Sequence, residues 1–189
     1  MGNGIQACQT CCSNYNSNSH SPSPQKPLLS EYILSAGDDG IISQHKFIDN
    51  QLIPLKKYPK VDTPIYALEV TPDSKYFFIA GAKGFLQQYS LIDQLLLKSY
   101  GANFAGFDGV KSGKSHIKAM AISPDSRFLF TGDDRGWCKQ YDISKKEMLY
   151  DLGQVHVGGI FSLVVTPDSG FLFTSSEYGI LRQYKIGKL

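Results

Sequence analysis

The chain has 189 residues, a formal net charge of +2 and 19% charged residues. This length is enough for a domain with a buried hydrophobic core. Its basic residues are scattered apart from the run KKYPK at 56–60, so the composition predicts no nucleic-acid binding. There is no secretion signal and no apolar run approaching 18 residues, which favours an intracellular, cytoplasmic protein.

Composition divides the chain near residue 29. Residues 12–27 are mostly Ser, Asn and Pro, with almost nothing apolar. Such a segment cannot bury enough surface to offset the entropy lost on ordering. We therefore predict a disordered N-terminal tail over 1–29 and a folded part over 30–189.

The first twelve residues, MGNGIQACQTCC, contain candidate lipidation sites. Removal of the initiator methionine exposes Gly2 for N-myristoylation, although Gln6 replaces the usual Ser or Thr. One myristoyl chain binds a membrane only marginally, so stable anchoring needs a second signal. Palmitate could supply it on three nearby cysteines: Cys8, Cys11 and Cys12. One hypothesis is thus a lipid anchor at the cytoplasmic face of a membrane, and the other is a leader without a function.

The cysteines do not resemble a secreted disulfide framework, because three are crowded in the tail and Cys138 stands alone. Cys8, Cys11 and His20 could form half of a zinc site, but a closed site needs four well-spaced ligands. We predict reduced thiols, no metal site and no cofactor.

An internal repeat is the strongest feature of the chain. Three stretches superimpose: IYALEVTPDSKYFFIAGAKGFLQQYS from Ile65, IKAMAISPDSRFLFTGDDRGWCKQYD from Ile117 and IFSLVVTPDSGFLFTSSEYGILRQYK from Ile160. A partial copy, YILSAGDDGIISQHK, begins at Tyr32. Each unit has an apolar run, a Ser/Thr-Pro-Asp-Ser turn, a second run, a turn ending in Gly and a third run. With a fourth run between units, the repeat predicts a four-stranded antiparallel meander.

A period of about 43 residues with four strands is typical of a β-propeller blade. On the Ser/Thr-Pro-Asp-Ser turn, the Gly turn and the aromatic residue that closes the third strand, residues 30–189 resemble the WD40-repeat family. The units depart from the family because none has the Trp-Asp pair. The aromatic position, always preceded by Gln, holds His45, Tyr89, Tyr141 and Tyr184.

The resemblance implies structural roles for several polar residues. The family's turn aspartate aligns with Asp39 in the first unit, but with Lys83, Arg135 and Tyr178 in the others, so its polar tetrad is incomplete. His116 and His156 match the place of the family's structural histidine. The tyrosines are expected to pack between blades.

The segment GVKSGKS at 109–115 resembles a phosphate-binding loop. A P-loop needs four residues between its glycines, and only three separate Gly109 from Gly113. The flanks predict neither a preceding strand nor a following helix. We therefore expect a surface loop inserted between two blades.

The sequence predicts 14 strands in an all-β, partial propeller of about four blades. Its first blade would lack the innermost strand and its last blade the outermost, leaving open edges that favour self-association. Three arrangements remain open: a fragment of a longer product, an arc completed by another chain, or a closed four-bladed ring.

Two functions from different classes follow. The WD40 resemblance implies a non-enzymatic scaffold that binds other proteins. The alternative is a propeller enzyme, such as a lactonase-like hydrolase, with a metal in the central channel. The innermost strands carry Glu69 and Lys118 but no repeated acid, so no catalytic residue is predicted.

Overall fold

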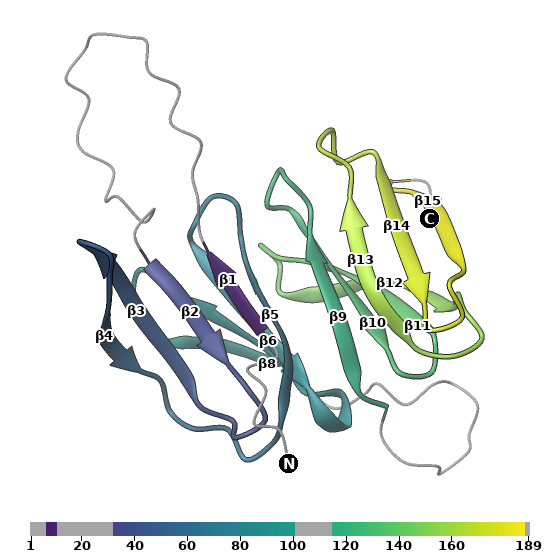
Figure 1. Ribbon diagram of the computed structural model, residues 1–189. Helices are drawn as coiled ribbons and strands as arrows, with labels where there is room; N and C mark the ends of the chain where they lie inside the picture. The colour runs from purple at the N-terminus through teal and green to yellow at the C-terminus, as the bar shows by residue number, and fades with distance from the viewer. Residues whose placement is uncertain (1–6, 11–31, 101–114, 188–189) are drawn as a thin grey trace, which may run out of the picture.

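The computed structural model describes residues 32–100 and 115–187, together with the backbone of 7–10. These residues form four antiparallel sheets arranged side by side in an arc, which we number blades 1 to 4 in chain order (Figure 1). A 3-10 turn, η2 (Ala82–Gly84), interrupts blade 2. The prediction of an all-β, blade-repeated body is confirmed.

Each blade is a meander whose strands follow one another from the inside of the arc outward. Blade 1 contains β1 (Ala7–Thr10), β2 (Tyr32–Ala36), β3 (Ile42–Ile48) and β4 (Gln51–Lys57). Blade 2 contains β5 (Ile65–Val70), β6 (Tyr76–Gly81), β7 (Leu86–Ser90) and β8 (Leu96–Tyr100). Blade 3 contains β9 (Ile117–Ile122), β10 (Phe128–Asp133), β11 (Trp137–Asp142) and β12 (Glu147–Gln154). Blade 4 contains only β13 (Ile160–Val165), β14 (Phe171–Ser176) and β15 (Leu181–Lys185).

The innermost strand of blade 1 was not predicted. Residues 7–10 form β1 and pair antiparallel with β2, from Ala7 opposite Ala36 to Thr10 opposite Ile33. The prediction of 14 strands is therefore one short. Sequence reasoning missed β1 because its four residues have no alternating pattern and stand far from β2 in the chain. The rest of the predicted tail lies outside the described residues.

The Ser/Thr-Pro-Asp-Ser segments form the turns between the first two long strands of blades 2 to 4. In blade 3, the Ser123 hydroxyl accepts a hydrogen bond from the Phe128 N–H at 2.9 Å, and the Asp125 carboxylate accepts one from the Arg127 N–H at 3.1 Å. Ser126, the last residue of the motif, has a φ of 60°, which the turn requires. Blades 2 and 4 repeat these contacts around Thr71 and Thr166.

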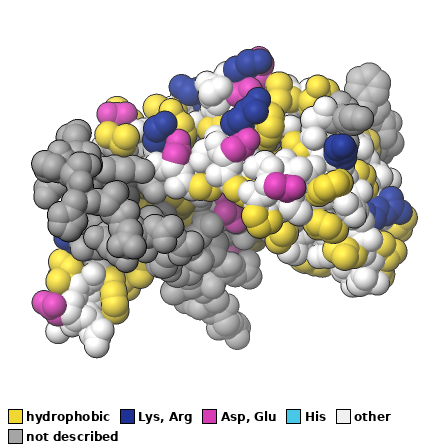
Figure 2. Space-filling model, turned by 90° about the horizontal axis from the view of Figure 1, so that it is seen from above, with side chains coloured by type: hydrophobic (Ala, Val, Ile, Leu, Met, Phe, Trp, Pro, Cys, Tyr) yellow, Lys and Arg dark blue, Asp and Glu magenta, His cyan; other side chains and the backbone are white. Residues whose placement is uncertain are grey.

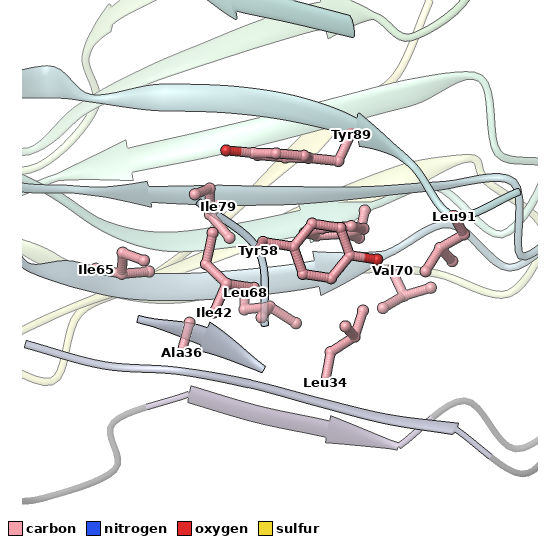
Figure 3. Packing of buried hydrophobic residues seen from close by; sticks show 11 residues of the cluster. Leu34, Ala36, Ile42, Tyr58, Ile65, Leu68, Val70, Ile79, Tyr89 and Leu91 are labelled. Carbon is pink, nitrogen blue, oxygen red and sulfur yellow. The ribbon is translucent and has the colours of Figure 1, made fainter. Parts of the chain in front are cut away.

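Three hydrophobic clusters form the core, and each lies between two neighbouring blades. In the first, shown in Figure 3, Leu34 and Ile42 of blade 1 pack with Ile79 and Leu91 of blade 2. The second cluster joins blades 2 and 3, and the third joins blades 3 and 4. Burial of apolar surface between blades, rather than within them, thus holds the arc together.

The arc is open at both ends in the described part of the chain. No core cluster joins blade 4 to blade 1 among the described residues, and the two blades lie at opposite ends of the arc (Figure 1). The described residues therefore do not form the closed four-bladed ring that was one of the three alternatives. Within the same residues, no helix has the length and apolar character to cross a bilayer.

Candidate functional site

One face of the arc is formed by the ends of the blades at which the innermost strands β5, β9 and β13 begin. We call it the mouth face. Here β5, β9 and β13 begin, and β6, β10 and β14 end beside them, as the pairing of Ile65 with Gly81 and of Ile160 with Ser176 shows. The connections between blades and the Gly turns lie at the same end. Side chains from successive blades can therefore converge on a ligand at the mouth face.

Tyr66 and Lys118 meet at the mouth face. Each follows the first residue of its strand, β5 for Tyr66 and β9 for Lys118, so the repeat places them on adjacent blades. The Lys118 Nζ atom lies 3.6 Å from the centroid of the Tyr66 ring, a cation–π contact. The His116 ring lies 6.1 Å from the same ring, centroid to centroid. All three side chains are half-buried and keep a surface for contact.

Two aspartates, Asp38 and Asp134, lie near Tyr66. The Asp134 carboxylate accepts a hydrogen bond from the His116 N–H at 2.9 Å, and its other oxygen lies 4.0 Å from the His116 Nε2 atom. Burial, followed by the nearby charges of Asp38 and Asp134, raises the pKa of Tyr66. The tyrosine is therefore neutral at physiological pH and can donate a hydrogen bond.

Blade 4 adds exposed apolar groups to the mouth face. Phe161, the β13 counterpart of Tyr66 and Lys118, is 59% exposed. Val157 and Tyr178, at 75% and 67%, lie in the neighbouring connection and Gly turn. A Cβ atom at Gly158 would stand 2.7 Å from the Tyr178 ring, so the glycine allows that connection to pass close to Tyr178. The face therefore offers aromatic and aliphatic contacts beside a lysine and two carboxylates.

The two candidate structural histidines have different surroundings. His156 is 2% exposed, and its Nε2 atom lies 2.6 Å from the Thr174 hydroxyl on β14. This contact agrees with the structural role implied by the resemblance. His116 instead lies on the mouth face and receives a long hydrogen bond from the Lys83 N–H, at 3.4 Å. Their spacing in the sequence already differed, because His116 directly precedes its strand whereas His156 lies four residues before Ile160.

The closing tyrosines pack between blades, as predicted. Tyr89 stacks on Phe77 at 4.8 Å and belongs to the cluster between blades 1 and 2, and Tyr141 and Tyr184 belong to the next two clusters. Two of the preceding glutamines, Gln44 and Gln88, have a role that sequence reasoning did not assign. The Tyr58 hydroxyl donates to the Gln44 side chain at 3.2 Å, and the Tyr100 hydroxyl donates to Gln88 at 2.8 Å.

Asp133 is a further structural residue that the sequence did not single out. Its carboxylate, 4% exposed, accepts hydrogen bonds from the N–H groups of Arg135 and Trp137 at 2.9 and 2.8 Å. These bonds shape the Gly136 turn of blade 3, where the family's turn aspartate is replaced by Arg135. The adjacent pair of acids in the sequence was the only available indication.

The lipidation candidates remain without side-chain information. Gly2, Cys11 and Cys12 lie outside the described residues, and Cys8 is described only as part of the β1 backbone. Of the phosphate-loop-like segment, only Ser115 is described, and the strand β9 follows it rather than a helix.

The ligands that a channel metal would need are not gathered in the described part of the chain, where no three His, Cys, Asp or Glu residues form a metal-binding group. Lys118, one of the two polar residues noted on the innermost strands, rests on the Tyr66 ring. Figure 2 shows another face, seen from above, where basic and acidic side chains are interspersed with hydrophobic ones and form no large patch of one sign.

Comparison with known proteins agrees with this architecture. The family model described as WD domain, G-beta repeat, matches residues 108–142. The solved β-propeller domain of Cps50 (Swd1) from Myceliophteria thermophila is similar, with a TM-score of 0.68 and 16% sequence identity. The chain therefore contains a WD40 repeat at 108–142 and has the fold of a WD40 β-propeller. WD40 propellers are typically non-enzymatic and generally bind other proteins.

The similarity covers 84% of this chain and 50% of the Cps50 domain, so the chain spans about half the length of that propeller. The search of curated proteins found no match. The match over 108–142 includes β9, β10 and β11 of blade 3, the unit that contains Lys118 and the Asp133 turn.

Proposed function

We propose that the chain is a non-enzymatic scaffold that binds a peptide segment of a partner protein at the mouth face. The observation that carries the proposal is the contact between Tyr66 and Lys118, with the exposed Phe161 at the equivalent position of blade 4. Aromatic side chains provide large contact areas at a low cost in conformational entropy, and interfaces are enriched in them. Fixed on rigid strands, these groups are prepared for binding.

The chemistry of the mouth face defines the kind of peptide. Lys118 and the aromatic rings favour a segment with an acidic side chain beside an apolar one, because the ammonium can pair with a carboxylate while Phe161 and Tyr178 cover the apolar neighbour. Asp38 and Asp134 disfavour a second acidic residue close to Tyr66 and can accept hydrogen bonds from the peptide backbone.

A selection from a random peptide library on the immobilised full chain tests this proposal. The selected peptides should be enriched in acidic and apolar pairs, and Lys118→Glu should weaken their binding at least about tenfold, or about 1.4 kcal/mol. The matched control is Lys145→Glu, which makes the same change of charge at an exposed position between β11 and β12. Equal weakening by both variants, or by neither, would contradict a site at Lys118.

We propose further that the tail tethers this scaffold to the cytoplasmic face of a membrane through Gly2 and the tail cysteines. The support is the sequence alone: an N-terminal glycine and three cysteines within ten residues of it. A tether would concentrate the mouth face near membrane-bound partner proteins.

A further inference from the structure

The outer face of blade 4 has the chemistry of an interface between blades. Two residues after each turn glycine stand Ile42, Leu86, Cys138 and Leu181. The first three are 0% exposed, and each belongs to the cluster shared with the next blade. Leu181 is 66% exposed. The difference arises because none of the described blades packs on this face of blade 4.

The neighbouring positions repeat this difference. Phe78 and Phe130 are fully buried against the next blade, but Phe173, their counterpart in blade 4, is only partly buried. Gln88 is fully buried and accepts a hydrogen bond from the Tyr100 hydroxyl, whereas its counterpart Gln183 is exposed. Among the described residues, blade 4 has no fourth strand to supply such a tyrosine. The face is therefore built to be covered by another blade.

The complementary face lies at the other end of the same chain. Seven residues after the turn glycines, Leu91 and Ile143 are 5% and 3% exposed, because they pack against the preceding blade. Their counterpart in blade 1, Phe47, is 50% exposed. Blade 1 thus presents the kind of surface that blades 2 and 3 use to pack on their predecessors.

We propose that a second copy of this chain completes the propeller, with blade 4 of each copy packed on blade 1 of the other. The chain matches half of a solved propeller domain, so two copies supply the length of a whole one. Two arcs of four blades give 2 × 4 = 8 blades, within the range of about 4 to 8 at which propellers close. A head-to-tail contact that closes after two copies gives a C2 ring, with no unpaired end.

Light scattering on the purified full chain tests the ring, with variants at each end. The wild type should have a mass of 2 × 20.9 kDa, and Leu181→Asp and Phe47→Asp should each reduce it to 20.9 kDa. The control is Ile92→Asp, at a residue 67% exposed in the β7–β8 connection, which should leave the dimer intact. Should Leu181→Asp lose the β-sheet circular dichroism signal, Gln183→Lys, on the same face, takes its place.

Mixing the two variants distinguishes head-to-tail pairing from other contacts. In an equimolar mixture, the unchanged blade 4 face of Phe47→Asp can pack on the unchanged blade 1 face of Leu181→Asp, so dimers should reappear. A wild-type monomer at all concentrations would overturn the proposal and indicate that other parts of a longer chain cover the face. A dimer broken by Leu181→Asp but not by Phe47→Asp would overturn it in favour of two blade 4 faces packed on each other.

Discussion

The Nε2 atom of His156 lies 2.6 Å from the Thr174 hydroxyl, which links the connection between blades 3 and 4 to the second strand of blade 4. Both side chains are buried, at 2% and 0% exposed. His156 thus has the structural contact expected from the WD40 resemblance, although Tyr178 occupies the position of the family's turn aspartate. A buried polar pair of this kind stabilises the blade only while both partners are present.

Thr174→Val should lower the free energy of unfolding by about 1 to 3 kcal/mol, because it leaves the His156 nitrogen buried without a partner.

Burial, and then the charge of Arg182, lowers the pKa of His156 below its ordinary value of about 6.5. The unfolded chain therefore binds a proton more readily than the folded chain, and this contribution to stability is lost as the pH falls below about 6.5.

The measurement is the urea unfolding midpoint between pH 7.5 and 5.5 for the wild type, His156→Gln and the control His116→Gln. The wild type and the His116 variant should lose stability on acidification, and the His156 variant should lose less. Parallel curves for all three proteins would show that His156 does not contribute to the pH dependence.

Gly136 and Gly179 occupy equivalent turns but should tolerate a side chain differently. Both have a positive φ, +85° and +72°. A Cβ atom at Gly136 would lie 2.0 Å from the His156 carbonyl oxygen, whereas at Gly179 no atom of the described residues lies within 4 Å. Gly179→Ala should cost about 1 kcal/mol, the conformational term alone, and Gly136→Ala more than about 3 kcal/mol.

Chemical denaturation of the two glycine variants checks this difference. The turn pattern in the sequence predicts that both positions need glycine, and the positive φ at each confirms that expectation. It could not predict the difference between them, because that depends on which backbone from the next blade passes over the turn. Similar losses of stability for the two variants would contradict the close approach of His156 to Gly136.

Cys138 should resist alkylation in the folded chain. Its thiol is fully buried, and burial, together with the charges of Asp133 and Asp151, raises its pKa to about 12. The reactive thiolate is therefore scarce at pH 8, and the reagent has no access to the sulfur. Peptide mass spectrometry after iodoacetamide treatment should find Cys138 modified only in denaturant. Modification at equal rates with and without denaturant would place it outside the core.

Membrane attachment remains a prediction from the sequence. Fractionation of cells should find the native-terminus chain in the membrane pellet, and Gly2→Ala or replacement of Cys8, Cys11 and Cys12 by Ser should move most of it to the soluble fraction. Equal solubility of all three forms would leave the tail without an anchoring role. Cys8→Ser alone tests whether the one candidate cysteine that β1 places in the first blade is needed for attachment.

The internal repeat explains which parts of the fold could be predicted from the sequence. The Ser/Thr-Pro-Asp-Ser and Gly turns fix strand order and register locally, so blades 2 to 4 follow from them. The strand β1 could not be predicted, because its pairing with β2 is a long-range contact. The Tyr66–Lys118 contact was equally hidden: each residue is ordinary in its own strand, and only packing of adjacent blades brings them together.

The most direct test of a partner-binding scaffold is an amide chemical-shift map of the isotope-labelled chain titrated with a peptide selected on it. The largest shifts should lie at the starts of β5, β9 and β13, at Tyr66, Lys118 and Phe161, and should disappear with Lys118→Glu. Shifts confined to the outer strands β4, β8 and β12, with the mouth face unchanged, would contradict binding at the mouth face.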